Sequence, residues 1–163
     1  MSRAGTIDGP QLARDRGTVS GTLGIDALPR LAASGCEAAT LRYQVHGAIN
    51  AAGRPCLAVE AAGVAMLACQ RCLDAVEFRV ELRVELQLAA SEREIVEADD
   101  DVDRVLATNA MDVAALVEDE VLLVLPMVPM HERCEPDAGQ RAANRAAPFA
   151  VLAGLRKSGG ADD

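Results

Sequence analysis

The chain has 163 residues, half of them hydrophobic, which is typical of a single folded domain with a sizeable core. Its formal net charge of −9 argues against a general nucleic-acid binder, because phosphate binding relies on clustered lysine and arginine, and it favours either simple solubility or a basic partner. The sequence holds no run of about 18 apolar residues and no secretory signal, so neither a membrane span nor export is expected.

The chain opens with residues 1–16, which are polar and are expected to form a flexible N-terminus. A short strand is predicted from Thr18 to Leu23. Between residues 24 and 33 apolar side chains recur at spacings of three, which indicates a short helix, although Pro29 weakens this prediction. The apolar residues in question are Ile25, Leu28 and Leu31.

Extended segments are predicted through the middle of the chain. Residues 41–46 alternate between apolar and polar, the period of a half-buried strand. A turn at 51–55 is followed by an extended apolar pattern over 56–67. The clearest strand spans residues 76–88, which are apolar at every even position and polar at the odd ones. One face of the sheet is therefore expected to be buried and the other solvated, with this long strand bent or shared between two partners.

An acidic segment and a helix complete the predicted domain. Residues 91–104 carry a run of aspartates and are expected to form a loop. Asp112 can cap the helix that follows, and Pro126 ends it after Leu125. The elements together predict an α+β fold, in which a bent antiparallel β-sheet packs against one main buried helix, with short N- and C-terminal helices.

Three regions are therefore expected along the chain. Residues 1–16 form the flexible N-terminus, and residues 17–134 form a single α+β domain that includes the acidic loop. Residues 135–163 are predicted to be a linker and a C-terminal helical anchor, in which residues 149–157 form the helix.

Two short clusters could carry metal chemistry. Cys69-x-x-Cys72 lies between two predicted strands, and His131-x-x-Cys134 follows the long helix. Three sulfurs and one imidazole nitrogen make a tetrahedral zinc set. Because roughly 60 residues separate the two halves, more than in compact zinc fingers, a zinc site and ordinary side chains near a surface turn both stay open. A redox pair is disfavoured, since a strand rather than a helix follows the cysteines.

Charged side chains suggest contact surfaces rather than catalysis. Glu118, Asp119 and Glu120 are consecutive on a helix, point in different directions and do not converge on one site. With the acidic segment, they are predicted to bind a basic partner, and Arg71 is a further candidate contact. The alternative is direct RNA binding by a stripe of arginines, although aromatic stacking platforms are missing. That stripe comprises Arg71, Arg79 and Arg83.

Three stretches in order resemble the YceD family of large ribosomal RNA subunit accumulation proteins. They are CQRCL at 69–73, VEDEVLLVLPMVPMH at 117–131 and PFAVLAGLRK at 148–157, and the resemblance spans about residues 17–157. Ala147 stands where asparagine is typical of the terminal box, and the spacing from His131 to Cys134 is shorter than in some relatives.

The resemblance implies a cytoplasmic factor that supports the synthesis, processing or accumulation of large-subunit (23S) ribosomal RNA, and it implies no catalytic residues. The expected partner is a basic ribosomal or RNA-processing protein, with no membrane contact. Direct binding of precursor ribosomal RNA is the alternative. An RNA-processing enzyme is placed last, because the sequence shows no convergent acid cluster, catalytic triad or phosphate-binding loop.

Overall fold

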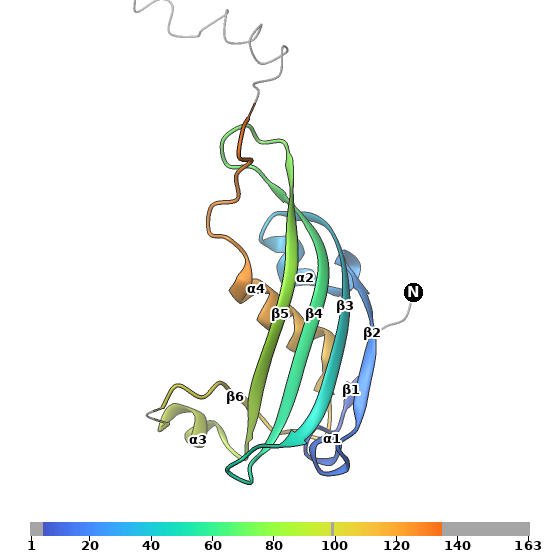
Figure 1. Ribbon diagram of the computed structural model, residues 1–163, viewed down its shortest axis with the longest axis vertical. Helices are drawn as coiled ribbons and strands as arrows, with labels where there is room; N and C mark the ends of the chain where they lie inside the picture. The colour runs from blue at the N-terminus through green and yellow to red at the C-terminus, as the bar shows by residue number, and fades with distance from the viewer. Residues whose placement is uncertain (1–4, 99, 135–163) are drawn as a thin grey trace, which may run out of the picture. The chain divides into compact units, whose positions relative to one another are not determined.

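Five strands form one sheet in the order β2-β3-β4-β5-β6 (Figure 1). They are β2 (Thr18–Gly24), β3 (Cys36–Ile49), β4 (Pro55–Ala68), β5 (Ala75–Ala89) and β6 (Arg104–Leu106). The computed structural model describes residues 5–98 and 100–134, so the predicted linker and C-terminal helix lie outside the described residues. The chain divides into two units, residues 1–130 and 131–163, and the whole sheet belongs to the first.

The alternation in β5 separates a buried face of the sheet from a solvated one. Val80 and Leu86 are buried, whereas Glu81 and Arg83 are exposed, as their period of two predicts. The pattern ends at Gln87, which is buried although it is polar. β5 pairs with β4 along its length and with β6 only at its end, so the prediction of a long shared strand is confirmed.

Helix α4 (Val113–Val124) packs on the buried face together with the short α2 (Pro29–Ala33), which follows the 3₁₀ turn η1 (Ile25–Ala27) (Figure 1). The carboxylate of Asp112 accepts hydrogen bonds from the N–H groups of Ala114 and Ala115, so the predicted cap is confirmed. Apolar side chains of α4 complete the core. Those that are buried are Val113, Leu116, Val117 and Val121. The α+β class is therefore confirmed.

The N-terminal segment departs from the prediction of a flexible region over 1–16. Residues 6–7 form β1 (Thr6–Ile7), which pairs with β7 (Met111–Asp112), and they lead into helix α1 (Gly9–Asp15). Asp8 caps α1 by accepting from the N–H of Gln11 at 2.7 Å. The helix lies directly on β3, and its Ala13 is fully buried. Polar composition hid this contact, because a single buried alanine gives no periodic signal.

The acidic segment is also more structured than a loop. It contains α3 (Glu92–Val96), which Ser91 caps through its hydroxyl. The chain then returns so that β6 pairs with β5 in parallel, which corrects the expectation of an antiparallel sheet at this one edge. No helix in the described part of the chain is long and apolar enough to cross a membrane.

Candidate metal centre and contact surfaces

The turn between β4 and β5 presents two buried thiols. The N–H of Cys69 donates to the C=O of Asp74, and the N–H of Leu73 donates to the C=O of Cys69, both at 2.9 Å. Leu73 adopts a left-handed backbone conformation with φ of 67°, which turns the chain sharply just after Cys72. Cys69 is fully buried and Cys72 is 7% exposed. A tight turn with cysteines at its first and fourth positions is the geometry of a zinc knuckle.

A backbone hydrogen bond fastens the segment that leaves α4 to this turn. The N–H of Gln70 donates to the C=O of Pro129 at 2.9 Å. Pro129 lies two residues before His131, so this bond ties the end of the first unit to the cysteine turn. Within that second half, the Sγ of Cys134 lies 3.9 Å from the Nδ1 of His131.

The four predicted ligands come together. The candidate ligand atoms of Cys69, Cys72, His131 and Cys134 all lie within 4.8 Å of one another. Sulfur atoms around one tetrahedral zinc ion lie about 3.8 Å apart, given a Zn–S bond of about 2.3 Å, so the cluster is close to ligand spacing. The group could therefore bind a metal such as zinc. Four protein ligands would leave no open coordination position, which favours a structural role.

Glu118 is buried, which corrects its assignment as a partner contact. Its side chain is 2% exposed, and its Oε1 accepts from the N–H groups of Arg30 and Leu31 at 2.7 and 2.9 Å. The other carboxylate oxygen accepts from the Nε of Arg30 at 2.9 Å. Glu118 thus satisfies the first amides of α2, whose start at Pro29 leaves them without helical partners. The helical pattern alone could not reveal this contact, because α2 is 88 residues away along the chain.

Asp119 is exposed and Glu120 is half-buried, and Arg71 is exposed at the cysteine turn. Asp119 is 54% exposed and forms an ion pair with Arg30. Burial raises the pKa of Glu120, and the nearby carboxylates of Asp103 and Asp119 raise it further. The acidic segment and α4 therefore bring carboxylates together on one acidic surface, and Asp103, Asp119 and Glu120 all belong to the residues that the sequence had singled out. Partner binding by Asp119, Glu120 and Arg71 stays a prediction.

The arginine stripe on the solvated sheet face is largely neutralised. Arg79 lies 3.4 Å from a carboxylate oxygen of Glu77, and Arg83 lies 3.3 Å from one of Glu60. A shallow hollow of about 720 Å³ on this face is lined by charges of both signs. Among its lining residues are Arg42, Glu60, Glu81 and Arg83. Such mixed charge is a poor match for a polyphosphate chain.

The remaining cysteines lie outside the cluster. Cys36 is 4% exposed and Cys56 is fully buried. Burial raises the pKa of both thiols, which makes them weak nucleophiles and poor metal ligands at neutral pH.

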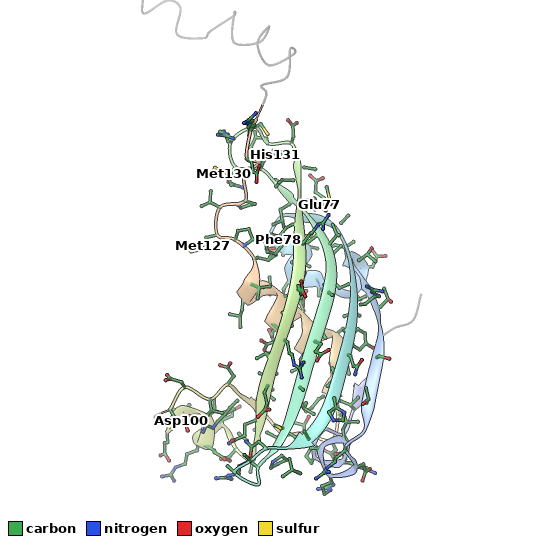
Figure 2. All side chains as sticks on the ribbon, viewed as in Figure 1. Glu77, Phe78, Asp100, Met127, Met130 and His131 are labelled. Carbon is green, nitrogen blue, oxygen red and sulfur yellow. The ribbon has the colours of Figure 1, made fainter. Side chains whose placement is uncertain are left out.

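Apolar side chains on the segment after α4 are unusually exposed. Met127 is 99% exposed and Met130 is 54% exposed, and Figure 2 labels both on this segment. In the sequence, this stretch carries only part of the resemblance to the YceD family. Its alternation of proline and apolar residues is the signal that could have marked it, since prolines keep such a segment from folding back into a helix.

Comparison with known proteins supports one family. The model of the family described as large ribosomal RNA subunit accumulation protein YceD matches residues 57–156. No match was found among curated proteins or among solved structures. The matched region covers more than half of the chain and includes the cysteine turn, the acidic segment, α4 and the segment that follows it. The chain belongs to the YceD family of large ribosomal RNA subunit accumulation proteins.

Proposed function

We propose that this protein supports the accumulation of large-subunit ribosomal RNA as a non-catalytic factor in the cytoplasm, and that it acts by binding a basic ribosomal or RNA-processing protein. Family membership implies the involvement in large-subunit ribosomal RNA. The observation that supports binding to a basic partner is the shared acidic surface of α4 and the segment before β6.

This acidic surface keeps much of its charge. Asp101 and Asp103 are exposed, and the guanidinium of Arg104 is paired with Asp100, which Figure 2 labels. Glu120 gains part of its raised pKa from Asp103, so like charges are held close together here. Such a concentration of carboxylates costs free energy in the isolated protein, and lysine or arginine from a partner would relieve that cost.

In this proposal the metal-binding cluster has a structural role. Bound zinc would join the turn after β4 to the chain that leaves α4. It would thereby fix the exposed segment around Met127 and Met130 next to Arg71. This end of the protein offers apolar groups and a cation, and it would form a second contact region for the partner.

Direct RNA binding is the second candidate, and exposed Arg71 on the cysteine turn favours it. Zinc knuckles with basic side chains recur among RNA-binding modules. The paired state of Arg79 and Arg83 makes a broad RNA surface less favourable. An RNA-processing enzyme is the third candidate and the weakest, because the buried carboxylate of Glu118 is engaged with α2.

Charge reversal tests the proposal. The variant Asp101→Lys/Asp103→Lys/Glu120→Lys is expected to lose the co-purifying basic proteins of the large subunit or its processing machinery. The control Glu77→Lys/Glu81→Lys/Glu85→Lys changes net charge equally on the open face of β5 and is expected to keep them. Equal retention by both variants would contradict the acidic contact. Filter binding with purified large-subunit RNA separates the second candidate, since steep salt dependence without any protein partner would favour it.

A further inference from the structure

Strand β2 is an edge strand whose outer backbone groups pair with no other strand in the described part of the chain. It lies at one end of the strand order, and Figure 1 shows it outermost beside β3. The N–H of Gly47 donates to the C=O of Gly17 at 2.9 Å, so this opposite pair is a hydrogen-bonded one. Antiparallel pairs alternate, and therefore the N–H and C=O groups of Thr18, Ser20 and Thr22 point away from β3.

The β2 edge lacks the devices that usually block strand addition. Natural edge strands carry charges, proline or bulges that discourage pairing with another chain. Thr18–Gly24 contains no charged residue and no proline, although a quarter of the chain is charged. Strand β5, towards the other side of the sheet, is charged at five alternate positions. These are Glu77, Arg79, Glu81, Arg83 and Glu85.

We propose that β2 pairs antiparallel with β2 of a second copy of this protein, so that the two sheets continue into each other about a twofold axis at Gly21. The strand sequence is self-complementary in this register. Ser20 would face Thr22 of the second copy on the solvated face, and Val19 would face Leu23 on the buried face. Hydroxyl pairs and apolar pairs are the favourable cross-strand combinations, and both faces supply them at once.

The centre of this pairing suits close approach. A side chain at Gly21 would meet the ring of Tyr43, whose oxygen would lie 2.8 Å from an added Cβ. Glycine therefore leaves room at the axis for the tyrosine ring to pack against the strand. A basic partner is not favoured at this edge, because the uncharged strand offers it no carboxylate. A second copy is favoured, because two acidic chains can meet here without like charges opposing each other.

Paired cysteine variants test the register. Ser20→Cys and Thr22→Cys place thiols on residues that would oppose each other at a Cα separation of about 5.5 Å, which a disulfide can span. A mixture of the two variants is expected to form a crosslink between positions 20 and 22, identified by peptide mass spectrometry. Each variant alone is expected to form far less crosslinked dimer. Absence of this crosslink in the mixture would overturn the proposed pairing.

The mass of the protein in solution tests the dimer itself. In sedimentation equilibrium, the apparent mass of the full chain is expected to approach twice 17.1 kDa as the protein concentration rises. Ser20→Pro and Thr22→Lys act on the outer edge without removing a bond to β3, and they should weaken association by about tenfold or more. Ala62 lies in the same cross-strand row as Thr22 but on the inner strand β4, so Ala62→Lys should leave association unchanged. A wild-type protein that stays monomeric at every concentration would overturn the proposal. The proposal would then be wrong even if β2 receives a strand from a different protein.

Discussion

At the scale of single residues, Glu118 joins two elements that are distant in sequence. Its buried carboxylate accepts two backbone N–H groups of α2 and the side chain of Arg30. Removing this carboxylate leaves the amides of α2 without an acceptor and Arg30 without its buried partner. Glu118→Ala is therefore expected to lower the free energy of unfolding by about 3 kcal/mol, measured by urea denaturation.

Asp119 supplies the matched control for that measurement. It is the neighbouring carboxylate and also pairs with Arg30, but it is 54% exposed. Exposed ion pairs contribute less than about 1 kcal/mol, so Asp119→Ala is expected to have only a small effect. Similar losses in the two variants would show that burial of Glu118 does not carry the stabilisation.

Because of Glu120, we expect part of the free energy of unfolding to depend on pH with the opposite sign to that of a salt-bridged acid. Its pKa is raised in the folded protein, so folding holds a proton that the unfolded chain releases. Stability contributed by this group is therefore lost as pH rises above the ordinary glutamate pKa. Glu120→Gln should be more stable than wild type at neutral pH, by less than about 1 kcal/mol, and the gain should vanish in acid. Glu81→Gln, on the open face, is the control, and a gain of the same size there would contradict the assignment.

The cysteine cluster predicts one bound zinc ion for each chain. Metal analysis of protein purified without chelator should find it, and Cys69→Ser should lose it together with thermal stability. Cys36→Ser, a buried thiol outside the cluster, should keep the metal. Acidification should release zinc, because thiolates and imidazole must lose protons to bind it. Wild-type protein that contains no metal and is no more stable than Cys69→Ser would contradict the zinc prediction.

At the scale of elements, α1 and β3 meet at Gly47. A Cβ added there would lie 2.1 Å from the backbone oxygen of Leu12, so only glycine permits this contact. Gly47→Ala is expected to displace α1 and lower stability by about 1–3 kcal/mol, the usual cost of overpacking. Gly5→Ala, which meets no atom within 4 Å, is the control in the same thermal unfolding experiment. An unchanged Gly47→Ala melting temperature would show that α1 does not stabilise the sheet.

The elements that the sequence predicted well are those whose signal is local. The alternation in β5 and the cap at Asp112 depend on residues next to each other in the chain, and both are confirmed. Contacts between distant segments escaped prediction. The packing of α1, the parallel pairing of β6 and the burial of Glu118 depend on partners that no local pattern reveals. The four candidate metal ligands could be named from the sequence because cysteine and histidine are characteristic metal ligands, whereas only the tertiary structure shows how close they lie.

At the scale of the whole molecule, the sheet has one face that carries the core and one that faces solvent. Helices and core occupy one face of the sheet, and ion-paired charges of both signs occupy the other. Unbalanced acid gathers where α4 meets the segment before β6. Because the family is one of large ribosomal RNA subunit accumulation proteins, this surface is the part of the protein that we connect with that process.

The ratio of large-subunit to small-subunit ribosomal RNA in cells tests this account most directly. The protein would be replaced at its own locus by the Asp101→Lys/Asp103→Lys/Glu120→Lys variant or by the Glu77→Lys/Glu81→Lys/Glu85→Lys control, with protein levels matched. We expect the ratio to fall in the first strain, as it should also do in cells that lack the protein, and to stay normal in the second. A normal ratio in cells that lack the protein, or in cells with the first variant, would contradict it.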